Sequence, residues 1–286
     1  MSRNYPRLSI EEFGTHALKT GDLDPTYIAL SKMEWSDHQR ARWLLAYWCL
    51  YHCGVASYLS EFEGQEFWDK LGEAADNKTA PVEGIDRWPR GSERRHWRGG
   101  QAIASFNELR SEYINPLAMV DYICGEKLSL PFSEISERVQ EHRGFGPWIA
   151  FKVGDMIDRL GIREVSFDNA DVFMFKDPAM AAKMLFAERT GLSIAGVKDG
   201  KVKVKDSVIP EVVKFLEDYF KDFTAPPIHD RPVGLQEVET ILCKWKSHLN
   251  GHYPLNNDIE EINDGLQPWL FCDTAKEFHY HMPKGE

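Results

Sequence analysis

The chain has 286 residues, of which 43% are hydrophobic and 12% aromatic, enough for one large core or two lobes that share a cleft. This composition excludes a disordered or fibrous protein, and the net charge of −11 argues against coating of nucleic acid by bulk electrostatics. No apolar run approaches the ~20 residues of a membrane span, and the first residues lack the pattern of a signal peptide. We therefore expect a cytosolic protein without a membrane partner.

The five cysteines are odd in number and contain no CxxC pair. They indicate reduced thiols rather than a disulfide framework or a structural zinc site. Core packing is the expected role of Cys49 and Cys53, which are four residues apart on a predicted helix.

Helical periodicity begins in residues 36–58, whose apolar spacing predicts one helix with one buried face. Ser36 and Gln39 have the spacing of a capping box at its start. Gly54 lies inside the helical pattern, where another backbone would come close. The polar, Pro- and Gly-rich residues 76–91 predict a loop.

Further helices follow along the chain, and their predicted ranges are 101–124, 132–142, 147–160, 210–220 and 235–249. Residues 197–204 alternate in polarity around Asp199-Gly200 and predict a small β-hairpin. Residues 224–234 predict a surface linker. The fold class expected from these patterns is mainly α with a small β-hairpin.

The densest positive charge lies in residues 87–98, RWPRGSERRHWR, where five arginines face the single acid Glu93. Arginine binds phosphate oxygens in pairs and stays charged at any cellular pH. This segment is therefore a candidate phosphate site. A solvated charged loop and contacts to a DNA backbone alone are the alternatives.

A tight turn, Gly144-Phe145-Gly146-Pro147, joins the predicted helices 132–142 and 147–160. Glycine accepts positive φ and leaves no side chain between the backbone and an incoming phosphate. Pro147 suits the first position of a helix, whose N-terminal partial charge attracts anions. Phe145 is expected to point inward and hold the turn.

Gly161 ends the second of these helices, and Asp168 follows after a short extended stretch. With the turn, this order resembles the helix-hairpin-helix DNA glycosylases, in which an aspartate at this place is catalytic. The resemblance implies a two-lobed helical fold with the helix-hairpin-helix at 132–160, DNA contacts from Gly144, Phe145, Gly146 and Trp148, and a nucleotide flipped into the cleft. Trp148 stands where glycosylases with lyase activity carry a lysine, so lysine-based strand cleavage is not expected.

Four stretches, in order along the chain, resemble the alpha-glutamyl/putrescinyl thymine pyrophosphorylases, also described as phage amino acid:DNA transferases. They are ARWLLAYWCLYHCGVASYLSE (41–61), PRGSERRHWRGG (89–100), GFGPWIAFKVGDM (144–156) and CKWKSHLNGHYPL (243–255). The resemblance implies that an amine such as glycine, glutamate or putrescine displaces pyrophosphate from 5-pyrophosphoryloxymethyl-deoxyuridine in double-stranded DNA. Direct displacement and a methide-like intermediate both stay open.

The leaving pyrophosphate needs preorganised cations, and the candidates are Arg94, Arg95 and Arg98, with His96 as a proton donor. The attacking amine must lose a proton. Asp168 is the candidate base, and Asp171 would share that role or orient it, with a helix cap as the alternative for Asp171.

Three residues, His52, Glu61 and Trp97, are candidates for an amine or base pocket. A satisfied core histidine is the alternative for His52, and core packing is the alternative for Trp97. In the C-terminal stretch, Lys244 and His248 would share one helix face, with Lys246 turned away. All three are candidate pyrophosphate ligands, with solvent exposure as the alternative.

Residues 1–225 are expected to form the glycosylase-like catalytic domain and residues 226–286 a helical extension that completes its cleft. We expect a monomer in the cytoplasm of the infected bacterial host, with no obligatory cofactor. Mg²⁺ bound through the pyrophosphate stays open. The rival functions are a DNA glycosylase, which would need fewer cations in its pocket, and a non-catalytic DNA-binding module.

Overall fold

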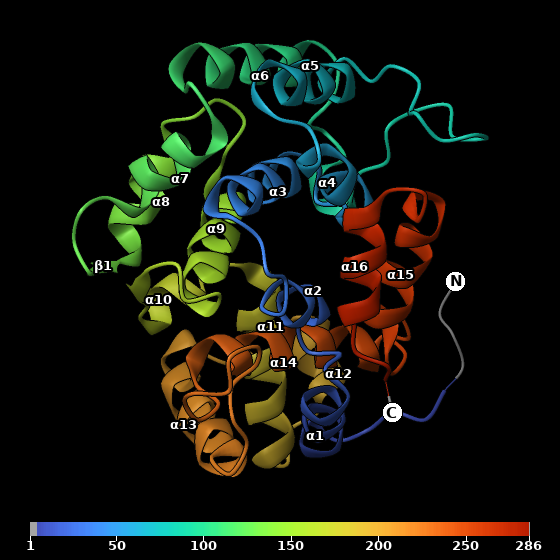
Figure 1. Cartoon of the computed structure of the whole chain (residues 1–286). Helices are drawn as coiled ribbons and strands as arrows, with labels where there is room; N and C mark the ends of the chain where they lie inside the picture. The colour runs from blue at the N-terminus through green and yellow to red at the C-terminus, as the bar shows by residue number, and fades with distance from the viewer. Residues whose placement is uncertain (1–4, 286) are drawn as a thin grey trace. The chain divides into compact units, whose positions relative to one another are not determined.

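The computed structural model describes residues 5–285 and is mainly helical, as the sequence predicts (Figure 1). The chain forms two compact units, each built from separated stretches. Unit 1 comprises the described residues of Met1–Ile28, Ser166–Ile259 and Pro283–Glu286, and unit 2 comprises Ala29–Val165 and Glu260–Met282. The domain division expected between residues 225 and 226 stays a prediction, and that point lies within unit 1.

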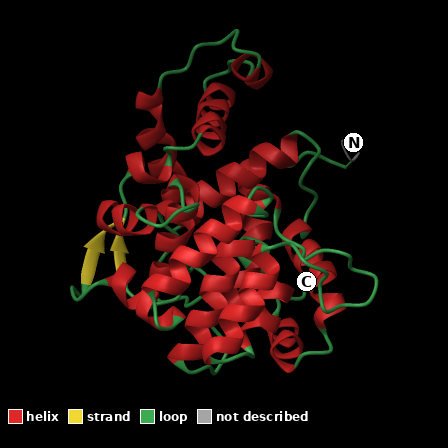
Figure 2. Ribbon diagram, turned by 90° about the horizontal axis from the view of Figure 1, so that it is seen from above, coloured by secondary structure: helices red, strands yellow, loops and turns green. Residues whose placement is uncertain are grey.

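Unit 2 contains most of the predicted site. Its elements are α3 (Asp37–Leu50), α4 (Cys53–Ser60), α5 (Gly64–Ala75), η1 (Ser92–Arg94), α6 (Gly100–Glu112), α7 (Pro116–Cys124), β1 (Ser129–Pro131), α8 (Phe132–Gln140), α9 (Pro147–Arg159), η3 (Gln267–Trp269) and α16 (Asp273–His281). The short strand β1 pairs in parallel with β2 (Glu164–Ser166), and the two strands are the arrows in Figure 2.

Helix α3 is the centre of the unit 2 core. Its residues 41–50 are all buried. The prediction of a helix with a single buried face is therefore wrong for these residues. Trp43 is fully buried, stacks on Phe278 of α16 with ring centroids 5.4 Å apart, and donates from Nε1 to Ser57 Oγ at 3.1 Å. Aromatic stacking and a satisfied indole N–H make this contact a specific one.

The single helix expected over residues 36–58 is in fact two helices, α3 and α4. Ser36 caps α3 by accepting from Gln39 N, as predicted, but Tyr51 then adopts a left-handed conformation with φ +52°. His52 restarts the chain as α4, with Nδ1 accepting from Val55 N at 3.2 Å. The left-handed Tyr51 ends α3 and the His52 side chain caps the start of α4, although the hydrophobic periodicity of the sequence continues across both residues.

Unit 1 is built around α14 (Leu235–Leu249), which packs against α1 (Ile10–Thr20) and α11 (Lys176–Arg189). Its other elements are α10 (Asn169–Val172), α12 (Ile194–Lys198), η2 (Asp206–Val208) and α13 (Ile209–Phe220). The chain passes between the units within α2 (Pro25–Leu30), β2 and α15 (Asn257–Leu266). The predicted bounds of α14 are confirmed, and those of α13 and α9 hold within one residue.

The β-hairpin expected over residues 197–204 is wrong, because these residues form the end of α12 and a loop. Ser193 Oγ caps α12 by accepting from Gly196 N, and the carbonyl oxygen of Gly196 accepts from Lys201 N and Val202 N at 2.7 and 2.9 Å. The predicted Asp199-Gly200 turn is present. Its backbone partners lie in the preceding helix rather than in a second strand.

A buried polar cluster ties the end of α1 to α14 and the start of α15. Asp22, 1% exposed, accepts from the backbone N–H groups of Asp258 and Ile259 at 3.1 Å each and from Tyr253 Oη at 3.2 Å. Lys244 Nζ donates to the carbonyl oxygen of Asp22 at 2.7 Å and pairs with Asp258 Oδ2 at 2.7 Å. Burial raises the pKa of Asp22 to about 6, against the opposing pull of Lys244.

This cluster predicts a pH dependence of stability. Between pH 3.8 and about 6 the folded protein keeps a proton on Asp22 that the unfolded chain has released, so the contribution of Asp22 to stability falls as pH rises through this window. Asp22→Asn removes the titration and keeps the acceptor. Urea unfolding at several pH values should show the wild type losing on the order of 2–3 kcal/mol relative to Asp22→Asn between pH 4 and pH 7. A constant difference across this range would contradict the assignment.

Gly54 of α4 confirms the close approach expected from the sequence. A Cβ at this position would lie 2.3 Å from Trp269 Cδ1 and 3.0 Å from the carbonyl oxygen of Gly265. Overpacking of this kind costs about 1–3 kcal/mol, so Gly54→Ala should lower the free energy of unfolding in urea by that amount. Gly100→Ala is the matched control, since its Cβ would meet nothing within 4 Å. Equal stability of both variants would contradict the packing.

Candidate active site

The turn predicted between two helices is present in unit 2, between α8 and α9. We call residues Arg143–Gly146 the glycine turn. Gly144 has φ +82°, which glycine adopts without strain, and Phe145 is buried at 2% exposure, as expected. Gly146 is the N-cap of α9 and Pro147 is its first residue. The predicted geometry of the turn is therefore confirmed.

The glycine turn rests on Trp97. The Nε1 of Trp97 donates to Ser105 Oγ at 3.2 Å, and that hydroxyl donates to the carbonyl oxygen of Arg143 at 2.6 Å. Trp97 is only 3% exposed. The structure thus places this candidate for the amine or base pocket underneath the turn.

Arg94 fixes the same turn from a second side. It donates from Nη1 to the carbonyl oxygen of Gly144 at 2.8 Å and from Nε to that of Cys49 at 3.1 Å. The side chain is buried, its guanidinium lies 5.2 Å from the centroid of the Phe145 ring, and Nη2 has no hydrogen-bond partner. Burial lowers its pKa, yet arginine keeps its charge at neutral pH.

The neighbouring arginines form a cluster without acidic partners. Arg90 donates to Asn77 Oδ1 and to the carbonyl oxygen of Ala74, and Arg95 donates to that of Ser92. Burial, followed by the charges of Arg98 and Arg94, lowers the pKa of Arg90 to about 10. No salt bridge within residues 5–285 involves any of these four arginines. In a chain of net charge −11, such an uncompensated cluster attracts an anion.

The cluster adjoins the first turn of α9. A hollow of about 410 Å³ is lined by Glu93, Arg94, Arg95 and residues 146–149, and we call it the arginine hollow. The N–H groups of Gly146, Trp148 and Ile149 lie at the helix end, where no intrahelical acceptor exists. Two arginines and a helix N-terminus outweigh the charge of Glu93, so the arginine hollow suits a phosphate or pyrophosphate group.

Four other candidates of unit 2 lie elsewhere. His96 and Arg98 are exposed. His52 caps α4, and burial lowers its pKa to about 4, so the ring is neutral at pH 7 and accepts a hydrogen bond. Glu61 Oε1 accepts from Thr274 N at 2.8 Å at the start of α16. His52 and Glu61 thus stabilise helix ends.

The aspartates of unit 1 form a capping box on the short helix α10. Asp168 Oδ1 accepts from Ala170 N at 2.7 Å and Asp171 N at 3.0 Å, while Asp171 Oδ2 accepts from Asp168 N at 3.0 Å. Burial raises the pKa of Asp171, and the charge of Asp168 raises it further. Asp168 is exposed, and no hydrogen bond between described residues uses its Oδ2. Asp171 is therefore part of the cap of α10, the alternative given for it from the sequence, and its role beside Asp168 in catalysis stays a prediction.

The C-terminal candidates of unit 1 already have protein partners. Lys244 belongs to the Asp22 cluster, and Lys246 Nζ pairs with Asp177 Oδ1 at 2.8 Å. His248 accepts at Nε2 from Leu8 N at 3.1 Å, and its Nδ1 lies 2.8 Å from the carbonyl oxygen of Tyr253. Burial lowers the pKa of His248, so it is a neutral residue that links segments of unit 1.

Sequence analysis missed Arg143, which lies directly before Gly144 and is exposed. Its position next to the first glycine of the turn is a signal that could have identified it. Together, a helical fold, a tight turn and an arginine cluster without acidic partners are the features of a site that suits phosphate groups.

Known proteins with similar sequences indicate which kind of phosphate-binding site this is. The family model for amino acid:DNA transferases matches residues 18–253. A "Glycinyltransferase" of Pseudomonas phage PaMx11 is 54% identical over 293 residues, which cover 99% of each chain. A "Putrescinyltransferase" of Delftia phage PhiW-14 is 26% identical over 270 residues, covering 93% of this chain and 80% of that protein.

The chain belongs to the amino acid:DNA transferase family. The resemblance found in the sequence is thereby confirmed, and the protein is a transferase that modifies phage DNA by transfer of an amino acid or amine. Family membership favours the transferase over the base-excising hydrolase and the non-catalytic module. Within residues 5–285, no helix combines the length and apolar character needed to cross a bilayer.

The burial of Arg94 and the exposure of Arg95 predict opposite phenotypes. Arg94→Met leaves the carbonyl oxygens of Cys49 and Gly144, one in a buried and one in a part-buried hydrogen bond, without this donor. It should lower the free energy of unfolding by about 2–4 kcal/mol. Arg95→Gln should change it by less than about 0.5 kcal/mol and yet weaken binding of inorganic pyrophosphate. Urea unfolding and calorimetric titration measure both quantities. A stable Arg94→Met protein, or unchanged pyrophosphate affinity in Arg95→Gln, would contradict these roles.

Proposed function

We propose that the protein transfers glycine onto pyrophosphorylated hydroxymethyl-uracil in double-stranded DNA and releases pyrophosphate. The observation that carries the proposal is the arginine hollow, where Arg94 and Arg95, which have no acidic partners, lie at the N-terminus of α9. Transfer to an unactivated base would need no such cationic site, whereas a departing pyrophosphate gains negative charge as its bond breaks. The 54% identity to a phage protein named glycinyltransferase supports glycine as the amine.

In this reaction the amine nitrogen forms a bond to the methylene carbon on C5 of the base. The carbon–oxygen bond to pyrophosphate breaks, and the oxygen keeps the electron pair. Arg94, Arg95 and the N–H groups at the start of α9 stabilise that oxygen and its phosphates. The glycine ammonium gives up one proton before the attack, and the secondary ammonium that forms gives up a second proton to leave the neutral secondary amine.

We assign the proton acceptor to Asp168. Its Oδ1 is held by two backbone N–H groups and its Oδ2 is available, so the carboxylate is oriented but can still accept a proton. Asp171 positions it through the N–H of Asp168. The exposed Arg98 extends the positive surface towards the DNA backbone, His96 lies two residues before it, and Gly144, Gly146 and Trp148 offer contacts to the backbone.

No step is assigned to a metal ion. Within the described part of the chain, no group of three His, Cys, Asp or Glu side chains is arranged to hold one. Binding of Mg²⁺ through the pyrophosphate stays a prediction. Because both relatives are phage proteins, we place the reaction in the cytoplasm of the infected bacterial host.

The proposal is tested by mass spectrometry of nucleosides. Purified protein is incubated with DNA that carries the pyrophosphorylated base and with glycine, glutamate or putrescine in separate reactions. We expect a glycine adduct and stoichiometric pyrophosphate. Asp168→Asn keeps the helix cap and should lower the rate by about 10²-fold or more, whereas Asp199→Asn, an exposed aspartate of unit 1, should not.

Three other outcomes would contradict parts of this proposal. A putrescine or glutamate adduct with no glycine adduct would refute the amine assignment, and abasic sites would refute the transfer on this base. Full activity of Asp168→Asn would remove Asp168 from the mechanism.

A further inference from the structure

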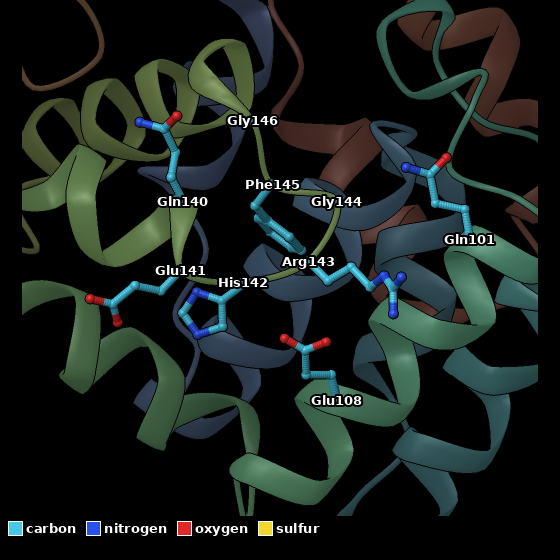
Figure 3. A pocket seen from close by; sticks show the side chains of 9 residues that line it. All are labelled: Gln101, Glu108, Gln140, Glu141, His142, Arg143, Gly144, Phe145 and Gly146. Carbon is cyan, nitrogen blue, oxygen red and sulfur yellow. The ribbon is translucent and has the colours of Figure 1, made fainter.

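A second hollow lies on the glycine turn, and its chemistry differs from that of the arginine hollow. It has a volume of about 660 Å³ and is lined by Gln101 and Glu108 of α6, the end of α8, and residues 142–146 (Figure 3). We call it the polar hollow. Gly146 lines both hollows, so they are adjacent within unit 2.

Three polar side chains of the polar hollow already have partners. Glu141 accepts a hydrogen bond from Tyr122 Oη, and Figure 3 shows its side chain pointing away from Arg143. His142 is buried, with Nε2 2.7 Å from Tyr113 Oη and Nδ1 3.2 Å from the carbonyl oxygen of Val139. Gln140 donates to Ser136. Both ring nitrogens of His142 are thus occupied, and the Glu141 carboxylate is held by Tyr122 away from Arg143 (Figure 3).

Arg143 and Glu108 differ from these residues. Neither side chain makes a hydrogen bond or an ion pair within residues 5–285, although both line the same hollow. Figure 3 shows the Glu108 carboxylate facing the glycine turn on the side to which Arg143 extends. The polar hollow therefore presents one free cation and one free carboxylate, which have no salt bridge with each other.

This charge pattern selects the class of ligand. A DNA phosphate or a pyrophosphate would be repelled by Glu108 and Glu141, and a diamine would be repelled by Arg143. A zwitterion satisfies both free groups at once, because its carboxylate pairs with guanidinium and its ammonium pairs with carboxylate. We propose that the polar hollow binds the incoming α-amino acid, with its carboxylate on Arg143 and its ammonium on Glu108. The inference rests on the proposed function and names the site of its amine substrate.

Gly146 lines both hollows, so the proposed amino acid site lies next to the proposed pyrophosphate site. A Cβ at Gly146 would meet nothing within 4 Å, so the backbone here is open. The pyrophosphate site and the amino acid site then lie on two sides of one short segment, which keeps the nucleophile and the leaving group apart. The hollow is larger than a small amino acid, so Arg143 and Glu108, rather than shape, set the specificity.

The test compares glycine with glycinamide, which keeps the amine but has no carboxylate. With the full-length protein and pyrophosphorylated DNA, the wild type should prefer glycine. Arg143→Gln should raise the KM for glycine at least about tenfold and remove the preference over glycinamide. Glu108→Gln should raise the KM for both amines. Arg110→Gln and Glu137→Gln, exposed charges outside the hollow on α6 and α8, are the matched controls.

Variants that have no measurable activity are tested by direct binding of glycine. Saturation-transfer NMR should detect glycine on the wild type without DNA and lose that signal in Arg143→Gln and Glu108→Gln. Unchanged KM and NMR signal in both variants would overturn the inference. So would an Arg143→Gln protein with weaker, less salt-dependent DNA binding but an unchanged KM for glycine. If the wild type transfers none of the amines, the proposed function fails instead.

Discussion

The hydrogen bonds of the Arg94 guanidinium hold the candidate site together. Through the carbonyl oxygens of Cys49 and Gly144, this one side chain joins the end of α3 to the glycine turn. The glycine turn also fixes the start of α9, whose first N–H groups line the arginine hollow together with Arg95. Burying an arginine costs less where its donors find acceptors. The carbonyl oxygens that accept from Nε and Nη1 of Arg94 are placed by the end of α3 and by the left-handed Gly144, so these two features act together.

The two hollows are proposed to bind a polyanion and a zwitterion, and they differ in their local charge. On the arginine hollow, positive groups exceed negative ones and a helix N-terminus adds to them. On the polar hollow, the two carboxylates of Glu108 and Glu141 exceed the single cation Arg143. The glycine turn separates these environments without a side chain at Gly146. Local placement of charge, rather than the net charge of −11, thus accounts for the proposed chemistry.

Part of this structure was predictable from the sequence. The helices 147–160 and 235–249 have clear periodicity and clear ends, and the structure agrees within one residue. The break at Tyr51 was not predictable, since His52 caps α4 with a side chain that periodicity does not register. Alternation in residues 197–204 was misleading because Gly196, a helical residue, supplies the backbone acceptors.

The sequence identified residues 87–98 as a candidate site, but it did not predict the roles of individual side chains. Arg94 and Arg95 are equivalent in sequence, and only tertiary packing buries one and exposes the other. Lys244 and His248 were expected to contact phosphate, but their partners Asp22, Asp258 and Leu8 are distant in sequence or outside the motif. Long-range pairing of this kind decides whether a polar residue serves the fold or a ligand.

The most direct test is a crystal structure with an oligonucleotide that bears the pyrophosphorylated base, using Asp168→Asn to slow turnover. The account predicts the pyrophosphate in the arginine hollow, within hydrogen-bond distance of Arg95 and of the N–H groups that begin α9. Pyrophosphate bound to other cations, such as Lys246, with the arginine hollow empty, would contradict it.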